Sequence, residues 1–450
     1  MSGSSNDLLI EGAATVATLA GGLRRGAAQG DAGVLSGGRM SVAVWGGRVL
    51  AVGRQAYVHR RLAAEGHSLG AFERIDARGG LVTPGLVDAH THLLFGGTRE
   101  AEWQMRAAGA GYLEILAAGG GILSTVAATR AASDKELLAG GRARLTQMLA
   151  NGTTTAEAKS GYALNLGGEL RLLALTDRLS REGPLELVPT FLGAHAVPAE
   201  FRDRRDGGNG TDEYVDHVIG EQLPAVLRQG IARSCDVFCE TGVFDAAQSR
   251  RILEAAASAG LAVRMHADEL APSGGAELAG ELAGELAGKP AAGRGCLSAD
   301  HLAAPSDEGV AALARAAAEG HPVVATLLPA TSWFLGKHHF APARRFIDEG
   351  IPVALATDLN PGTSPTLSLP LVMSIACLEM GLTPLEALVG VTVNAAHALG
   401  LGSEVGSIEP GKQADLVLWD VPTVEQLPYW LGGSPARTVV KRGRVVFERD

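Results

Sequence analysis

Cysteine, aromatic residues and clustered charge are all scarce in this chain of 450 residues, and each scarcity excludes a class of protein. Four cysteines with no Cys-x-x-Cys spacing exclude a disulfide scaffold and predict buried thiols in a reducing compartment. Aromatic residues make up 4% of the sequence against 46% hydrophobic residues, so the core must be built mainly from Ala, Val and Leu. The net charge of −10 is spread along the chain without a basic run, which excludes nucleic acid as a partner.

Sequence features of secretion and of membrane insertion are also lacking. Asp7 and Glu11 stand where a signal peptide needs basic residues. The long uncharged stretch 359–378 contains Pro361, Pro365 and Pro370, which do not suit a bilayer-spanning helix. We therefore expect a soluble cytoplasmic protein that does not contact a membrane.

From residue 80 onward, short aliphatic runs recur that end in polar residues and precede Leu- and Ala-rich segments of helical periodicity. Eight such units predict an α/β fold, a (β/α)8 TIM-type barrel, in which function lies where the strands end. The predicted strands are 86–92, 153–159, 187–195, 235–240, 261–269, 296–301, 323–328 and 351–358, and the clearest helices are 134–149, 169–182, 246–259 and 307–319.

Both ends of the chain instead contain short alternating strands separated by Gly-rich turns. The turns at Gly46-Gly47 and at Arg442-Gly443 are typical of β-hairpins. We predict a small β-sandwich domain composed of residues 1–80 plus 405–450, and a barrel domain of residues 81–404.

One stretch, 275–288, repeats Gly-Glu-Leu-Ala almost in tandem. Its glutamates fall near one helix face, where like charges repel by a few tenths of a kcal/mol per pair. Each interior glycine costs up to about 1 kcal/mol of helix stability. We interpret the repeat as an insertion that lengthens a surface helix on the outside of the barrel and carries no chemistry.

Histidines and one aspartate at predicted strand ends point to a metal site. His90 and His92 stand two residues apart, so strand alternation places both side chains on one face. His266 and Asp358 end the fifth and eighth predicted strands, at the same mouth of the barrel. Three imidazoles and a carboxylate suit zinc or ferrous iron and leave a position for water. Glu269, three residues after His266, is a candidate for proton transfer.

Several segments carry a resemblance to a known family. Pro84 to His92 resembles the first-strand signature of the amidohydrolase superfamily. Together with the other segments, it resembles the imidazolonepropionase family of histidine degradation over nearly the whole chain, and Lys-Ser-Gly-Tyr and Asp-Leu-Asn-Pro-Gly are specific to that family. The other segments are 96–99, 118–122, 159–162, 266–269, 298–301 and 357–362.

The resemblance implies one divalent ion, Zn or Fe, bound by His90, His92, His266 and Asp358. It implies metal-dependent hydrolysis of the cyclic amide C–N bond of 4-imidazolone-5-propanoate, which yields N-formimino-L-glutamate. Asp358 or Glu269 would accept the proton of the attacking water, and Glu269 would pass it to the leaving nitrogen. His301 would polarise the carbonyl or orient the water. The division of these roles stays open at this point.

The resemblance also implies the contacts to this small anionic substrate. Arg99 would bind the propionate, because a guanidinium can hold a carboxylate through two parallel hydrogen bonds. Around the ring and the arm, the family pattern places Tyr162, His195, Glu269, Asn360, Gly362 and Thr363. The resemblance further implies a homodimer. Ala163 stands where the family usually has glycine, and its β-carbon is expected to restrict the loop that presents Tyr162.

Three alternatives to this function remain. A cyclic-base deaminase of the same superfamily would use the same ligand pattern and would release ammonia. A catalytically inactive barrel acting as a scaffold would be expected to have lost ligands, whereas all four are present. A carbamylated Lys159 bridging two metals is disfavoured, because the bridging lysine belongs on the fourth strand, which here ends in Cys239-Glu240.

Overall fold

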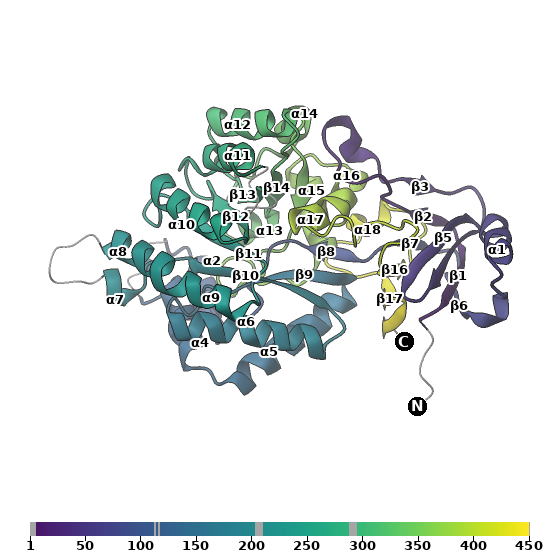
Figure 1. Cartoon of the computed structure of the whole chain (residues 1–450), viewed down its shortest axis with the longest axis horizontal. Helices are drawn as coiled ribbons and strands as arrows, with labels where there is room; N and C mark the ends of the chain where they lie inside the picture. The colour runs from purple at the N-terminus through teal and green to yellow at the C-terminus, as the bar shows by residue number, and fades with distance from the viewer. Residues whose placement is uncertain (1–5, 112–113, 116–117, 203–209, 288–294, 450) are drawn as a thin grey trace.

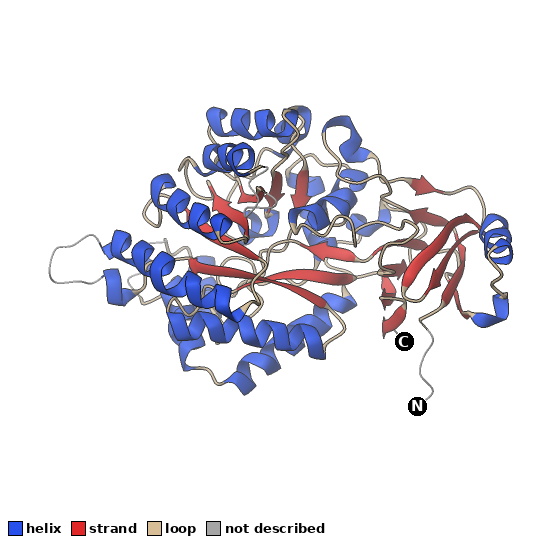
Figure 2. Cartoon of the chain, viewed as in Figure 1, coloured by secondary structure: helices blue, strands red, loops and turns tan. Residues whose placement is uncertain are grey.

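The computed structural model describes residues 6–111, 114–115, 118–202, 210–287 and 295–449. Within them, eight parallel strands follow one another in a single sheet with helices around it (Figures 1 and 2). The predicted barrel is confirmed, and each predicted strand has a counterpart. The strands are β8 (Leu86–Asp88), β9 (Thr153–Lys159), β10 (Glu186–Ala194), β11 (Ser234–Cys239), β12 (Ala262–Ala267), β13 (Cys296–His301), β14 (Val324–Leu327) and β15 (Val353–Leu355).

The two outer strands of this sheet are connected just beyond their ends. β8 and β15 are shorter than predicted, and no ladder joins them within the described residues. Instead, Asp358 N–H donates to the His90 carbonyl at 3.0 Å, and His92 N–H donates to the Leu359 carbonyl at 2.8 Å. The barrel is therefore closed by the segments that carry three of the four predicted metal ligands.

Helices cover the outside of the barrel, and two of the predicted ones begin with a capping box. Ser133 and Asp245 each accept a backbone N–H of the first helical turn, in capping boxes with Glu136 and Gln248. Both helices thereby satisfy N–H groups that a helix start leaves free. The main outer helices are α5 (Asp134–Ala150), α6 (Leu166–Glu182), α9 (Leu223–Gln229), α10 (Ala246–Ser258), α11 (Gly275–Leu286) and α12 (Asp307–Ala318).

Further helices lie in the loops and after the last barrel strand. They are α2 (Glu100–Ala107), α4 (Ile122–Ala131), α7 (Ala199–Arg202), α8 (Gly210–His217), α13 (Pro329–Phe334), α14 (Ala343–Asp348), α15 (Leu369–Glu379), α16 (Pro384–Gly390), α17 (Val393–Ala398) and α18 (Gln426–Tyr429). The core between strands and helices is dominated by Ala, Val and Leu, as the composition predicts. Cys235, Cys239 and Cys296 are buried in the barrel, whereas Cys377 is half-buried.

Strands from both ends of the chain form two further sheets, which lie together at one end of the molecule (Figure 1). One has the order β5-β4-β1-β6 and the other β18-β17-β16-β7-β2-β3. Both predicted hairpins, β4 with β5 and β17 with β18, are present. The strands are β1 (Leu8–Ala13), β2 (Thr15–Ala17), β3 (Val34–Leu35), β4 (Met40–Trp45), β5 (Arg48–Arg54), β6 (Glu73–Asp76), β7 (Leu81–Pro84), β16 (Leu416–Trp419), β17 (Ala436–Lys441) and β18 (Arg444–Glu448), and α1 (Gln55–Ala64) packs on β5.

The six-stranded sheet lies between the four-stranded sheet and the barrel. Leu416 and Leu418 of β16 join the apolar cluster of the terminal sheets, and the alternate residues Val417 and Trp419 join the barrel core. β7, within the range predicted for the barrel domain, pairs with β16 in this sheet. The residue bounds of the two domains stay a prediction.

The Gly-Glu-Leu-Ala repeat forms α11, up to Leu286, and Gly288 lies outside the described residues. The helix is in the outer layer as expected, and the structure offsets part of the two expected costs. Glu281 and Glu285 pair with Arg250 of α10, so their repulsion is offset. A β-carbon on Gly280 would lie 2.7 Å from the backbone carbon of Ala312, so this glycine permits close packing of α11 on α12.

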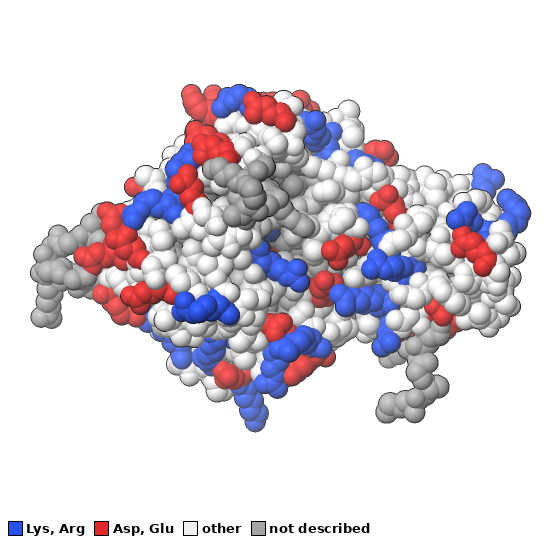
Figure 3. Space-filling view, in the orientation of Figure 1, with Lys and Arg blue, Asp and Glu red and all other residues white. Residues whose placement is uncertain are grey.

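Charges of both signs are interspersed over the face in Figure 3. Among the described residues, no helix is both long and apolar enough to cross a bilayer.

Candidate functional site

The four predicted metal ligands come together at the carboxyl ends of the barrel strands. His90 and His92 follow β8, His266 lies near the end of β12, and Asp358 follows β15. Asp358 Oδ1 lies 3.5 Å from His90 Nε2 and 3.6 Å from His92 Nε2. His92 Nε2 lies 3.4 Å from His266 Nε2. One carboxylate oxygen and three imidazole nitrogens therefore converge, as the sequence predicts.

The chemistry of these donors fits a divalent cation. His90 Nε2 is buried and has no hydrogen-bond partner among the described residues. Burial lowers the pKa of both His90 and His92 well below the usual value, which keeps the imidazoles neutral as metal ligands must be. Burial also raises the pKa of Asp358 to about 7, so its carboxylate needs a cation beside it to stay charged. Thr331 Oγ1 donates to the other oxygen of Asp358 at 2.6 Å.

Histidine and carboxylate atoms within 4.8 Å of one another form overlapping sets of three in the described part of the chain. Besides the set of His90, His92 and Asp358, one set joins His90 and His266 to His301, and another joins His92 and His266 to His195. His195 stacks on His92 with ring centroids 4.7 Å apart and an interplanar angle of 10°. His195 and His301 therefore border the ligand cluster directly.

Two buried carboxylates contact the Nδ1 atoms of two of the imidazoles, on the opposite side of each ring from Nε2. Asp300 Oδ2 lies 2.7 Å from His90 Nδ1, and Asp236 Oδ2 lies 3.1 Å from His266 Nδ1. Sequence reasoning missed both carboxylates. The available signal was charge inside strands predicted to be buried: Glu157 and Lys159 in β9, Asp236 in β11, Arg264 in β12 and Asp300 in β13.

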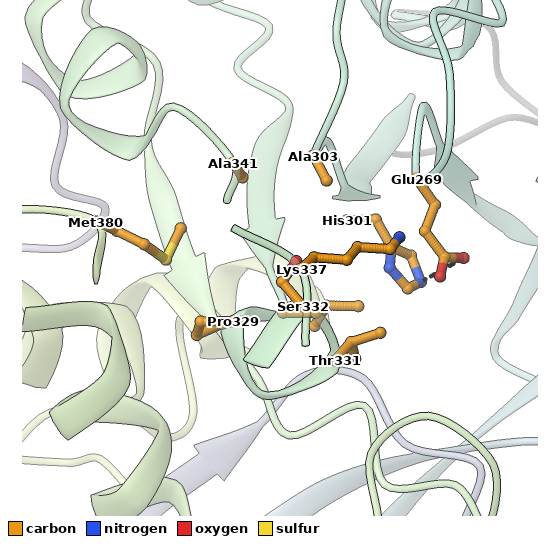
Figure 4. A pocket seen from close by; sticks show the side chains of 10 residues that line it. Glu269, His301, Ala303, Pro329, Thr331, Ser332, Lys337, Ala341 and Met380 are labelled. Atoms are coloured by element: carbon orange, nitrogen blue, oxygen red, sulfur yellow. Dashed lines mark ion pairs between the residues drawn. The ribbon is translucent and has the colours of Figure 1, made fainter. Parts of the chain in front are cut away.

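Glu269 and His301, the predicted proton-transfer residues, face each other at one side of the cluster. Glu269 Oε2 lies 3.7 Å from His301 Nε2, and Figure 4 shows the two side chains pointing toward one another. Burial lowers the pKa of His301 to about 4, although Glu269 acts in the opposite direction. Both line a cavity together with Thr331, Ser332 and Lys337. Lys337, which sequence reasoning missed, brings a cation to this cavity.

Tyr162 is buried beside the ligands, on a loop whose geometry depends on glycine at a different position from the one expected. Its ring centroid lies 5.5 Å from that of His92. Gly161 has φ +95°, and a β-carbon there would lie 2.8 Å from the Leu192 carbonyl oxygen. Ala163, by contrast, is not among the residues with positive φ. Ala163 therefore needs no glycine-like conformation, and the restriction of the loop by its β-carbon stays a prediction.

A buried carboxylate that sequence reasoning missed fixes the same loop. Glu169, in the first turn of α6, accepts the backbone N–H groups of Gly161, Ala163 and Leu164 at 2.7–2.9 Å. These three bonds hold the turn that carries Tyr162.

Arg99 reaches the eighth-strand loop, but part of its guanidinium is already engaged. Nε and Nη2 donate to the two carboxylate oxygens of Glu102 at 2.8 and 2.6 Å. A β-carbon on Gly362 would lie 1.9 Å from Arg99 Nη1, so that glycine makes room for the guanidinium. Nη1 is the guanidinium nitrogen that does not donate to Glu102.

Asn360 and Thr363 shape that loop. The Asn360 side chain donates to the Asp358 carbonyl at 2.7 Å and accepts the N–H groups of Gly362 and Thr363 at 2.9 and 2.7 Å. Asn360 therefore builds a turn that places Gly362 against Arg99.

Lys159 lies on the second barrel strand and is held as a cation. Its Nζ lies 2.8 Å from Glu157 Oε2 and 2.5 Å from Asp236 Oδ2. Burial opposes its charge, but these carboxylates raise the pKa of Lys159 above the usual value. Carbamylation requires a neutral amine, so the geometry gives no support to a bridging carbamate.

The chain with this barrel matches a known class of protein. The model of the amidohydrolase family matches residues 81–446, and the chain belongs to this family.

Within that family, its curated relatives include many imidazolonepropionases. The protein of that name from Geobacillus kaustophilus (strain HTA426) is 50% identical, over 92% of this chain and 91% of its own. The one from Symbiobacterium thermophilum is 48% identical, over 98% of this chain and 97% of its own.

Solved structures show the same fold at much lower identity. A 5-methylcytosine deaminase from Klebsiella pneumoniae liganded with phosphonocytosine has a TM-score of 0.71 and 16% identity, with 98% of each chain covered. An adenosine deaminase from Xanthomonas campestris with bound zinc has a TM-score of 0.66 and 20% identity, over 98% of this chain and 92% of that one. At this distance, the likeness concerns the fold alone.

Proposed function

We propose that this protein is an imidazolonepropionase, a hydrolase that opens the ring of 4-imidazolone-5-propanoate to N-formimino-L-glutamate in histidine degradation. The observation that carries the proposal is identity of 48–50% to imidazolonepropionases over more than nine-tenths of the chain. The convergence of three imidazoles and Asp358 at the strand ends supports it.

His90, His92, His266 and Asp358 would hold one zinc or iron ion. A divalent ion there would supply a Lewis acid that lowers the pKa of water toward neutrality. Asp358 is held by Thr331 through Oδ2, which leaves Oδ1 facing the histidines. Its carboxylate is thus oriented both to bind the cation and to take a proton from the attacking water.

Glu269 would pass the proton taken from the attacking water to the ring nitrogen that leaves, and His301 would act at the carbonyl oxygen. Glu269 is only partly buried and has His301 Nε2 at 3.7 Å, so it can exchange a proton with the ring nitrogen that leaves. Neutral His301 can donate a hydrogen bond to the carbonyl oxygen as charge develops on it. These residue roles are proposals.

Substrate orientation would come from Arg99, Tyr162, His195 and the turn at residues 360–363. Arg99 Nη1 is the group that would reach the propionate, while Glu102 holds the rest of the guanidinium in place. Tyr162 and His195 flank His92 and would form one wall for the ring.

The experiment is turnover of 4-imidazolone-5-propanoate by purified, metal-loaded protein. We expect loss of the substrate and appearance of N-formimino-L-glutamate without ammonia, and removal of the metal by a chelator should stop it. Ammonia release from a cyclic base, with imidazolone propionate left intact, would instead support the deaminase alternative. A folded, metal-loaded protein with neither activity would support the scaffold.

The homodimer and the location in the cytoplasm are also proposals. They are tested by the mass of the protein in solution and by cell fractionation.

A further inference from the structure

Five charged side chains are buried inside the barrel, below the ligand cluster, and none has a part in the steps above. Each is at most 1% exposed. They are Glu157, Lys159, Asp236, Arg264 and Asp300. Burying this much charge is costly unless the groups are paired, so their arrangement calls for a function.

The first pair fixes His266 at two points. Asp236 Oδ1 accepts the backbone N–H of His266 at 3.2 Å and faces its ring Nδ1 at the same distance. Lys159 Nζ lies 2.5 Å from the other oxygen of Asp236. One carboxylate, oriented by one cation, thus holds both the main chain and the ring of a single ligand.

The second pair fixes His90 in the same way, with the two tasks divided. Asp300 Oδ2 faces the His90 ring Nδ1 at 2.7 Å. Arg264 Nη2 donates to the carbonyl of Ala89, directly before His90, at 2.7 Å and lies 3.4 Å from Asp300 Oδ2. Arg264 Nη1 donates to the Ala398 carbonyl at the end of α17, which anchors the guanidinium.

Glu157 offsets the repulsion between Lys159 and Arg264, the cations of the two pairs. Its carboxylate lies between the cations, 2.8 Å from Lys159 Nζ and 3.2 Å from Arg264 Nε. Thr190 Oγ1 also donates to it, at 2.5 Å.

His92 has no such support, which provides a comparison inside the same site. Its Nδ1 has no hydrogen-bond partner among the described residues, and its ring is instead stacked on His195. The charged pairs are therefore a feature of particular ligands and not of every histidine at the mouth.

We propose that Lys159–Asp236 and Arg264–Asp300 are two positioning pairs, each of which fixes one imidazole ligand at both its ring and its main chain. A carboxylate at Nδ1 keeps the ring proton on that nitrogen, so the Nε2 lone pair faces the metal. The cations orient the carboxylates and keep them charged. This inference rests on the metal centre proposed above.

The hydrogen bonds distinguish the two carboxylates. Both oxygens of Asp236 face donors, so an asparagine there must turn its NH₂ group toward either Lys159 or His266. Asp300 Oδ1 has no partner among the described residues, so an asparagine can place its NH₂ group there and keep an oxygen toward His90. The same substitution should therefore be more damaging at position 236.

The test is the metal affinity of Asp236→Asn and Asp300→Asn, measured by competition with a zinc chelator. We expect a loss of about 10- to 100-fold for Asp236→Asn and a smaller loss for Asp300→Asn. The visible spectrum of the cobalt-loaded Asp236→Asn variant should also change, because it reports ligand geometry, which a purely structural role would leave alone.

Asp415→Asn is the matched control. Asp415 is buried, and its two oxygens accept from Lys441 Nζ at 2.8 Å and from the Arg442 N–H at 3.0 Å. Lys441 also pairs with Glu186 at the start of β10, the opposite end of the barrel from the site. The control therefore creates a donor conflict like that of Asp236→Asn without touching a ligand, and its metal affinity should stay within about twofold of the parent.

Two results would overturn the inference. One is a folded Asp236→Asn protein with parental metal affinity and cobalt spectrum, and the other is an equal loss of affinity in Asp415→Asn. If Asp236→Asn does not fold, unchanged affinity in Asp300→Asn would still count against it. Failure of the metal centre itself would look different, because the parent protein would then bind no zinc.

Discussion

The interior of the barrel and the interior of the terminal sheets are built from opposite chemistries. The terminal sheets enclose an apolar cluster that includes Leu8, Ile10, Val42 and Leu416, and their buried ion pair, Asp415 with Lys441, lies where the sheet meets the barrel. The barrel encloses apolar residues near its helices but ionised side chains along its centre. Apolar packing stabilises without fixing directions, whereas paired charges orient particular atoms. The comparison therefore assigns the ligand geometry to the charged centre of the barrel, whereas the interior of the terminal sheets contributes apolar packing.

The largest effect is expected where a ligand of the barrel centre is removed. His92→Ala should abolish metal retention and activity, because it removes one of three imidazole donors. His195→Ala is the matched variant, since His195 stacks on His92 and lies within 4.8 Å of two ligands. Metal content by mass spectrometry should be lost only in the first. The opposite pattern would make His195 the ligand.

A smaller effect is expected at the mouth of the barrel, where the charge of Arg99 would bind the substrate. Arg99→Ala should raise KM for imidazolone propionate by about 30- to 5000-fold, the equivalent of roughly 2–5 kcal/mol for losing the charge partner of the propionate. Steady-state kinetics with an imidazolone that lacks the propionate arm supply the contrast, and there the variant should match the parent. Arg142→Ala, a half-exposed arginine paired with Glu182, should leave KM unchanged. An unchanged KM in Arg99→Ala would remove Arg99 from the substrate site.

Truncation in the terminal sheets should affect stability alone. Ile10 is fully buried between the two sheets, so Ile10→Ala should lower the free energy of unfolding by about 2–5 kcal/mol. Chemical denaturation measures this loss, and chelator competition should show parental metal affinity at a temperature where the protein stays folded. Loss of metal affinity in the folded variant would show that the two regions are coupled.

The smallest effects are expected in α11, outside both interiors. Gly280→Ala should destabilise by about 1–3 kcal/mol, because its β-carbon would meet the Ala312 backbone at 2.7 Å. Gly284→Ala, one repeat further along, meets nothing within 4 Å and should stabilise by up to about 1 kcal/mol. Shifts of the melting temperature in opposite directions, relative to the parent protein, would confirm the close packing of α11 and α12. Shifts in the same direction would contradict it.

Local patterns in the sequence predicted the barrel and its ligands. Strand alternation and helix caps depend on neighbours a few residues apart, and His90, His92, His266 and Asp358 each end a recognisable unit. The substrate residues, from Arg99 to Thr363, came from family resemblance, and the structure brings Tyr162 and His195 against the ligands. Their roles stay predictions.

Long-range pairing could not be predicted in this way. Lys159 and Asp236 are 77 positions apart, and their contact depends on which strands are neighbours and how they are staggered. Charged residues in strands predicted to be buried signalled that partners exist without showing which. Similarly, only the packing of α11 on α12 shows that the structure requires glycine at position 280 and does not require it at position 284.

Anomalous diffraction from crystals of the metal-loaded protein, recorded at the zinc and iron edges, tests the metal centre most directly. We expect one peak per chain, about 2.0–2.2 Å from Nε2 of His90, His92 and His266 and from a carboxylate oxygen of Asp358. The atoms of Glu157 and Asp300 also lie within 4.8 Å of one another and of His90. A peak bonded to those carboxylates, with His92 and Asp358 free, would contradict the proposed site.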